Sequence, residues 1–182
     1  MKQMSEQIDL KNIKNILDAA FENFYRLDSE LLDYRTEDRA VSERCMVFHI
    51  GWYIQNLMKQ ESLFRDYSID SEYNRCFEHA KSMYKVTLAG IKEKIGDAIP
   101  DLIIHKRKSN AHNLAIFEFK KKGQYERKGR LDDFKKLKYF TDSNNEYKFK
   151  YGFWIVLYKK KVDVHVFQNG KELGHLKYTW VK

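Results

Sequence analysis

Two short apolar runs, Ile99-Pro-Asp-Leu-Ile-Ile-His105 and Leu114-Ala-Ile-Phe-Glu-Phe-Lys120, decide the fold of this chain. Each run is rich in β-branched or aromatic residues and is bounded by polar residues, which predicts a buried strand. The polar stretch 106–113 between them predicts a connecting loop. Together the two runs predict an antiparallel hairpin at the centre of a sheet.

The acidic residues of this hairpin are expected to face each other. Side chains alternate across a strand, so Glu118 and Lys120 share a face. With the turn centred between Ser109 and Asn110, Asp101 lies opposite Glu118, and the two Cβ atoms are roughly 5 Å apart. Two carboxylates on apolar strands repel each other and are poorly solvated. A divalent cation between them removes both costs, and carboxylate oxygens suit Mg²⁺.

Pro100-Asp101, followed after the hairpin by Glu118-Phe119-Lys120, resembles the signature of the PD-(D/E)xK nuclease superfamily, which has the restriction-endonuclease-like fold. Glu-x-Lys alone arises by chance in a charged chain. Its position inside a hydrophobic strand, with Pro-Asp heading the preceding strand, is more specific. The alternative is an ordinary amphipathic hairpin whose acidic residues face water.

The resemblance implies a metal-dependent reaction. Asp101, Glu118 and the backbone carbonyl of Phe119 would hold Mg²⁺ or Mn²⁺. Lys120 would stabilise a hydroxide or the charge that develops on the phosphoryl oxygens. By resemblance only, cleavage of a phosphodiester would leave a 5′-phosphate.

Glu43 is a further metal-site candidate. It lies one turn before Val47 on the apolar stripe of a helix predicted over 37–59. Burying a charge on this inward face costs free energy unless another charge pairs with it. In the family that the chain resembles, an acidic residue on the helix before the sheet often completes the metal site. The alternative is a carboxylate in water, paired with Arg39 or with Lys59.

Basic residues cluster around the proposed site. The chain has 34 Lys and Arg against 26 Asp and Glu, and the window from His105 to Lys138 holds twelve basic and four acidic residues. The remaining 22 basic and 22 acidic residues balance, so this window carries the whole net charge of +8. A basic rim attracts a polyanion and offers phosphate contacts, although a charge run can also be a solvated surface.

We therefore expect a set of nucleic-acid contacts. One source is the window itself, and another is the helix after the signature strand, which lies beside the active site in the family. A third is the run Glu72-Tyr-Asn-Arg75, which resembles a run at this point in some members, although a charged edge strand is the alternative. The candidates are Arg75, Lys106, Arg107, Lys121, Lys122, Lys135, Lys138 and Tyr139, with Glu72 as a second-tier residue.

Taken in order, the chain predicts one α/β domain over residues 1–182. We expect N-terminal helices within 1–60 (one over 8–24, capped by Asp9), a strand over 67–75, and a helix-containing insertion within 77–98. After the hairpin come a helix over 130–141, with Leu131, Phe134, Leu137 and Phe140 inward, and strands over 147–158, 162–167 and 173–181. Asn169-Gly170 predicts a hairpin turn. This order predicts a mixed central sheet flanked by helices, with a C-terminal hairpin. Over residues 37–167 it matches the αβββαβ core of the family that the chain resembles, so the resemblance implies a restriction-endonuclease-like core.

Composition narrows the functional class. Hydrophobic residues make up 43% of the chain, with 8 Gly and 1 Pro, which argues against disorder and linkers. No apolar run approaches the roughly 20 residues of a membrane span, and the first residues lack a signal peptide's apolar core. Two Cys without CxxC spacing predict reduced thiols. We expect a soluble, cytoplasmic protein without membrane partners.

The expected function is a metal-dependent nuclease that acts on nucleic acid, with DNA expected before RNA; double-stranded, single-stranded, branched and RNA substrates all stay open. A nuclease-fold module that binds nucleic acid without cutting is the first alternative, and a protein-interaction domain with a basic face is the second. Many enzymes of this fold act as dimers, so the resemblance also allows a homodimer. No base-reading motif is found, so no sequence specificity is predicted.

Overall fold

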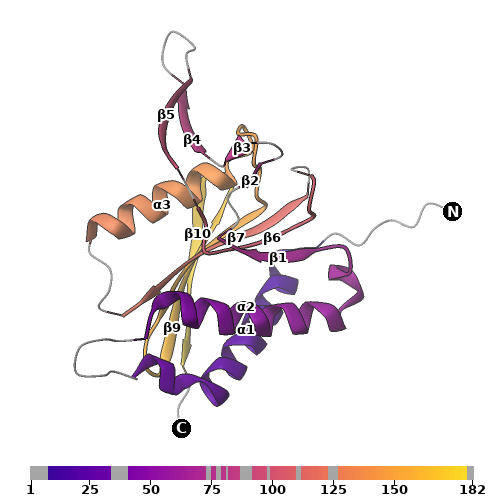
Figure 1. The fold of residues 1–182 in the computed structure, drawn as a ribbon, viewed down its shortest axis with the longest axis vertical. Helices are drawn as coiled ribbons and strands as arrows, with labels where there is room; N and C mark the ends of the chain where they lie inside the picture. Colours follow the sequence, from indigo (N-terminus) through magenta and orange to yellow (C-terminus); the bar gives the residue numbers. More distant parts are fainter. Residues whose placement is uncertain are drawn as a thin grey trace, which may run out of the picture.

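The protein folds into three layers, with a six-stranded sheet between two helices on one face and one helix on the other (Figure 1). A computed structural model describes residues 8–33, 41–72, 75–76, 79–80, 82–86, 92–97, 99–109, 112–122 and 127–179. The α/β class with a mixed sheet is therefore confirmed.

The two N-terminal helices pack against one face of the sheet. Helix α1, Leu10–Leu27, follows the predicted cap, because the Asp9 side chain accepts from the Asn12 amide and the Asn12 side chain accepts from the Asp9 amide. Helix α2, Glu43–Gln60, begins later than predicted, since Ser42 caps it by accepting from the Cys45 amide. Glu43 is thus the first residue of α2. The 3₁₀ helices η1, Ser29–Leu32, and η2, Ser62–Phe64, follow α1 and α2.

The sheet is mixed because one neighbouring pair of strands runs parallel. Its order is β1-β6-β7-β8-β9-β10, and only the β7–β8 pair is parallel, with helix α3 between them in the chain. The bounds are β1 Ser68–Ser71, β6 Leu102–His105, β7 Asn113–Lys121, α3 Arg127–Thr141, β8 Tyr151–Leu157, β9 Lys161–Gln168 and β10 Lys171–Thr179.

The central hairpin has the predicted register. Leu102 pairs with Phe117 and Ile103 with Ile116, which places the preceding residue, Asp101, opposite Glu118. The turn between β9 and β10 is also as predicted, because Asn169 and Gly170 have φ angles of 50° and 72°. The first strand is shorter than predicted and ends at Ser71.

The helix predicted within residues 77–98 is wrong for the part that the structure describes. Strands β2, Arg75–Cys76, and β3, His79–Ala80, form one two-stranded sheet, and β4, Ser82–Val86, and β5, Lys92–Asp97, form another. Residues of β4 such as Tyr84 and Val86 favour strands, and pairing with β5 overrides the weak helical pattern. Figure 1 shows β4 and β5 projecting away from the six-stranded sheet.

Two hydrophobic clusters fill the spaces between the layers. Phe117 and Phe119 of β7 pack toward α1 and α2, whereas Ile116 packs with Trp154, Leu137 and Phe140 on the α3 side. Glu118 and Lys120 therefore point toward α3, as alternation requires.

The predicted inward stripe of α3 is partly wrong. Leu131 is 52% exposed, whereas Asp133 is buried. The helix turns Asp133 and Lys136 toward the sheet, together with Leu137 and Phe140, because these residues are spaced at i, i+3, i+4 and i+7. None of the helices in the described ranges is long and apolar enough to span a membrane.

Candidate active site

Two carboxylates accept hydrogen bonds from backbone amides of β7 beyond the point where β7 pairs with β6. Pairing with β6 ends at Leu102 and Phe117, but β7 continues to Lys121. Beyond that point the Phe119 amide donates to Asp101 Oδ2 at 2.6 Å, and the Lys121 amide donates to Glu43 Oε2 at 3.2 Å. Side chains thus take the place of a neighbouring strand as hydrogen-bond acceptors. They pair backbone amides that would cost free energy if they were buried without a partner.

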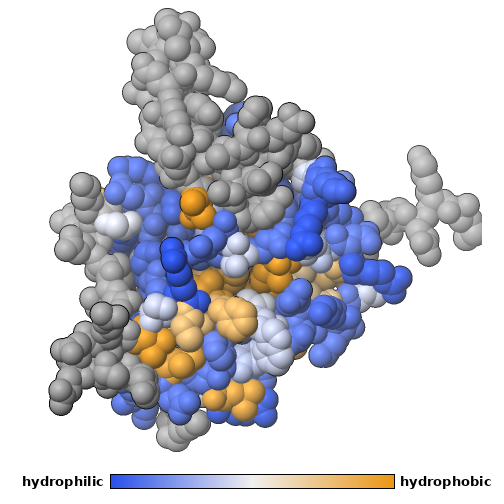
Figure 2. Space-filling view, viewed as in Figure 1, coloured by the Kyte–Doolittle hydropathy of each residue, from blue (hydrophilic) through white to orange (hydrophobic). Residues whose placement is uncertain are grey.

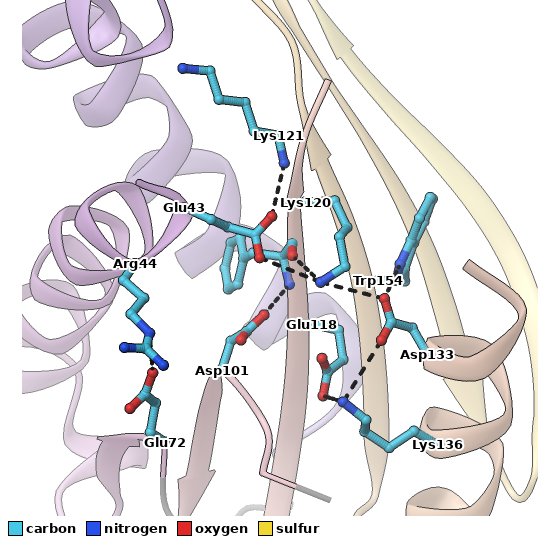
Figure 3. Close-up of polar contacts among 11 residues, drawn as sticks. Glu43, Arg44, Glu72, Asp101, Glu118, Lys120, Lys121, Asp133, Lys136 and Trp154 are labelled. Atoms are coloured by element: carbon cyan, nitrogen blue, oxygen red, sulfur yellow. Dashed lines mark hydrogen bonds and ion pairs between the residues drawn. The ribbon is translucent and has the colours of Figure 1, made fainter. Parts of the chain in front are cut away.

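The ammonium group of Lys120 bridges both sides of the site (Figure 3). It donates to the Phe119 carbonyl at 2.8 Å, and it lies 3.4 Å from Glu43 Oε1 and 3.4 Å from Asp133 Oδ2. Lys120 therefore joins the start of α2, the end of β7 and the first half of α3.

Glu118 is the most deeply buried carboxylate of the site. Its side chain is 2% exposed, and Lys136 Nζ lies 2.9 Å from its Oε1 atom. The same ammonium lies 3.7 Å from Asp133 Oδ1, while the indole of Trp154 donates to Asp133 Oδ2 at 3.3 Å. Asp133 is thus held by two lysines and an indole (Figure 3).

The site holds more negative than positive charge. Four carboxylates (Glu43, Asp101, Glu118 and Asp133) lie with two ammonium groups (Lys120 and Lys136), so the fully ionised cluster carries a charge of −2. Burial raises the pKa of Glu118 to about 8, and the charges of Asp101 and Asp133 add to that shift against the opposing effect of Lys136. The β6–β7 register places the two predicted carboxylates, Asp101 and Glu118, side by side (Figure 3).

Burial also raises the pKa of Asp101 and of Glu43. For Lys120, burial acts to lower the pKa, but Asp133, Glu43 and the other carboxylates outweigh it and raise the pKa overall. The pKa of Lys136 is raised in the same way, chiefly by Glu118. Both amines therefore remain protonated at neutral pH, whereas Glu118 binds a proton near neutral pH.

The donor atoms and the charge of the site fit a divalent cation. Carboxylate and carbonyl oxygens are the ligands that Mg²⁺ and Mn²⁺ prefer, and one dication equals the excess negative charge. In the arrangement described, however, ammonium groups hold these carboxylates. No group of three or more His, Cys, Asp or Glu side chains in the described ranges is close enough to hold a metal ion by itself.

A hollow of about 160 Å³ adjoins the site. Glu43 and Asp101 line it, together with Arg44, Val47, Phe48, Ser71 and Glu72. Arg44 and Glu72 form an exposed ion pair at 2.7 Å beside the start of α2. Glu72, the second-tier candidate, therefore lies beside the metal-site candidates, at the end of β1.

Three of the predicted nucleic-acid contacts lie away from the site. Lys106 and Arg107 follow β6 at the end opposite Asp101, where Lys106 pairs with Asp66 and Arg107 with Asp70. Lys121 is buried, since it points to the α1 and α2 side of the sheet, where its ammonium donates to the Leu31 carbonyl at 3.3 Å. Lys121 therefore does not line the candidate site in this arrangement, and its contact with phosphate stays a prediction.

The other predicted contacts are spread over the surface. Lys135 and Lys138 are exposed on the face of α3 away from Asp133, and Tyr139 packs against Phe140 and Tyr147. Lys122 is exposed, with its ammonium 5.9 Å from the ring centroid of Tyr158. Arg75 lies in β2, but its side chain lies outside the part of the chain described in atomic detail, as does Arg39.

Sequence reasoning missed Asp133 and Lys136. Neither residue is among the site residues that the sequence predicts. The signal was present, because Asp133 and Leu137 are spaced at i, i+4, as are Lys136 and Phe140. A charged pair on the stripe that also carries buried Leu137 and Phe140 predicts an inward ion pair.

The site therefore joins all the residues predicted to hold or assist a metal (Asp101, Glu118, Phe119, Lys120 and Glu43) to two further charges from α3. In comparisons with known proteins, no family model, no curated protein and no solved structure matches this chain.

Proposed function

We propose that the protein is a metal-dependent phosphodiesterase that cleaves nucleic acid, with DNA as the expected substrate. One observation carries the proposal: four carboxylates and two protonated lysines gather where β6 begins, with a charge of −2 when fully ionised. Buried charge of one sign is costly unless something neutralises it. Mg²⁺ or Mn²⁺ would remove that cost, and perturbed carboxyl groups beside a hollow are typical of functional sites.

The ligands of the cation would be Asp101, Glu118 and the Phe119 carbonyl, with Glu43 as a further or an orienting ligand. When bound, the metal would polarise a phosphoryl oxygen and lower the pKa of a coordinated water. The resemblance of Pro100-Asp101 and Glu118-Phe119-Lys120 to the PD-(D/E)xK signature supports the same assignment.

Lys120 would act on the charge that develops in the transition state. Because the surrounding carboxylates raise its pKa, it is an ammonium at neutral pH before a metal binds. It can donate hydrogen bonds to phosphoryl oxygens as their negative charge grows. Asp133 holds this ammonium on the α3 side, so it is a positioning residue.

A nuclease-fold module that binds nucleic acid without cutting it is the second candidate. The observation in its favour is that Asp101 and Glu43 already satisfy the Phe119 and Lys121 amides, while Lys120 and Lys136 partly neutralise the cluster. In that case the four carboxylates would stabilise the edge of β7 and nothing more.

A plasmid-nicking assay with Mg²⁺ or Mn²⁺ separates the two candidates. The parent should nick the plasmid, and Asp101→Asn and Lys120→Ala should abolish nicking while retaining DNA binding. Lys11→Ala is the control, because it removes an exposed lysine of α1, a helix that carries no predicted site residue. A parent that binds DNA but cleaves neither the plasmid nor a single-stranded oligonucleotide would support the second candidate.

A further inference from the structure

The outer face of α2 carries two exposed aromatic rings. Phe48 is 67% exposed and Trp52 is 53% exposed, and their i, i+4 spacing places them one turn apart on the same face. Arg44 precedes them by one turn, and Lys59 lies on the same side near the end of the helix; both are exposed. Figure 2 shows apolar surface over α2, bordered by hydrophilic surface. Such a patch indicates a binding surface.

This face is continuous with the candidate active site. Phe48 lines the 160 Å³ hollow together with Glu43 and Asp101, so one ring shares the hollow with two carboxylates of the site. Pockets for drug-sized ligands measure roughly 300–1,000 Å³. The hollow is therefore suited to a single planar group rather than to a whole small molecule.

A second hollow lies at the other end of α2. It measures about 430 Å³, and its lining includes Lys59, Arg65, Tyr67 and Arg107. Lys106 lies with its ammonium 5.0 Å from the centroid of the Tyr67 ring, which gives the same region an additional cation. Arg44, Lys106 and Arg107 are partly neutralised by Glu72, Asp66 and Asp70, in that order. Lys59 has no ion-pair partner among the residues the structure describes.

We propose that single-stranded nucleic acid lies along this face of α2, with unpaired bases stacked on Phe48 and Trp52 and phosphates near Arg44 and Lys59. Aromatic rings interleaved with cations are the usual platform for unpaired strands. This inference rests on the proposed function and deepens it, because it names the form of the substrate.

The spacing of the rings favours unpaired bases. Four helical residues rise about 6 Å along the axis. Successive bases in a duplex strand are only about 3.4 Å apart and are held against their partners. A flexible single strand can direct one base to each ring, and a strand that follows the helix toward Arg44 enters the hollow lined by Asp101.

Fluorescence anisotropy with labelled oligothymidine and with a duplex of the same length tests the proposal. The measurements use the full chain with EDTA present, so that cleavage plays no part. The parent should bind the single strand more tightly than the duplex. Phe48→Ala and Trp52→Ala should each weaken single-strand binding about tenfold. Leu173→Ala, which removes an exposed apolar side chain from β10, is the control and should change nothing.

Salt dependence supplies a second readout. Two phosphate contacts predict a slope of about −1.4 for log K against log salt concentration, and Lys59→Ala should reduce its magnitude by about 0.7. Unchanged single-strand binding in both aromatic variants would overturn the proposal, as would a parent that prefers the duplex. So would a dimeric parent that Trp52→Ala converts to a monomer without changing DNA binding.

The binding assay tests the stacking platform and the nicking assay tests the proposed catalysis, so a negative result in one does not decide the other. Single-strand binding that depends on the rings, without metal-dependent cleavage of either the plasmid or a single-stranded oligonucleotide, would support the platform and contradict the proposed catalysis. Nicking by a protein whose rings do not contribute to binding would do the reverse.

Discussion

The backbone amide of Phe119 donates to the side chain of Asp101, and this bond fixes a site carboxylate to the strand that carries Glu118 and Lys120. Glu43 is fixed to the same strand through the Lys121 amide. Short β6 leaves the edge of β7 open, and carboxylates from two other places in the chain fill it. The arrangement brings acidic groups together without the flexibility of a loop, as a functional site requires.

The double role of Asp101 can be separated by substitution. Asp101→Asn keeps an oxygen that can accept from the Phe119 amide, so its free energy of unfolding should stay within about 1 kcal/mol of the parent. Asp101→Ala leaves that amide without its partner and should cost about 1–3 kcal/mol. Urea denaturation measures both values. An alanine variant as stable as the parent would show that the bond contributes nothing to stability.

Glu118 should make stability depend on pH in a direction opposite to that of an ordinary paired carboxylate. Because burial raises its pKa in the folded protein from 4.5 to about 8, the folded state binds this proton more tightly than the unfolded state. Ionisation of Glu118 does not affect the free energy of unfolding below pH 4.5, and it lowers that free energy progressively as pH rises toward 8.

Comparing the parent with Glu118→Gln isolates this effect. The glutamine at position 118 of this variant cannot ionise. The free energy of unfolding of the variant, relative to that of the parent, should therefore rise by on the order of 3–5 kcal/mol between pH 5 and pH 9. Denaturation curves without divalent metal provide the measurement. A difference between the two proteins that stays constant over this range would contradict the raised pKa.

Lys120 should contribute to stability as well as to chemistry. Its removal leaves Glu43 and Asp133 with less compensation, so Lys120→Ala should lower the free energy of unfolding by about 1–3 kcal/mol at pH 7. Lys135→Ala breaks an exposed pair with Asp132 and should cost under about 1 kcal/mol. Equal losses in the two variants, measured by urea denaturation, would show that the network around Lys120 is no stronger than a surface pair.

Gly152 should not tolerate a side chain. A Cβ atom there would lie 3.0 Å from Thr141 Cγ2 and 3.3 Å from Phe167 Cβ, between α3 and the sheet. Gly152→Ala should therefore destabilise the fold by about 1–3 kcal/mol through overpacking. Gly129→Ala is the matched control, since a Cβ atom there would meet no described atom within 4 Å. A thermal melt in which both variants behave alike would contradict the packing of α3 on β8.

The sequence predicted the elements whose patterns are local. The stripe and cap of α1, the central hairpin with its register, and the Asn169-Gly170 turn follow from spacing and turn chemistry, and all three are present. Leu131 and the 77–98 segment were misread. Leu131 lies one residue outside the buried stripe of α3, and the strand pairing within 77–98 depends on tertiary context.

The candidate site was predictable only in part. Asp101, Glu118 and Lys120 follow from alternation within one hairpin, whereas the approach of Asp133 and Lys136 depends on the rotation of α3 against the sheet. The burial of Lys121 could have been foreseen, because it shares its face of β7 with Phe117 and Phe119. The ion pairs of Lys106 and Arg107 join residues about 40 positions apart and leave no local signal.

Calorimetric titration of Mn²⁺ into the purified protein at pH 8 tests the central claim most directly. We expect one ion to bind per chain. Its affinity should be at least tenfold weaker in both Asp101→Asn and Glu118→Gln and unchanged in Lys135→Ala. A parent that binds no Mn²⁺, or that binds it equally well without these two carboxylates, would contradict the metal site.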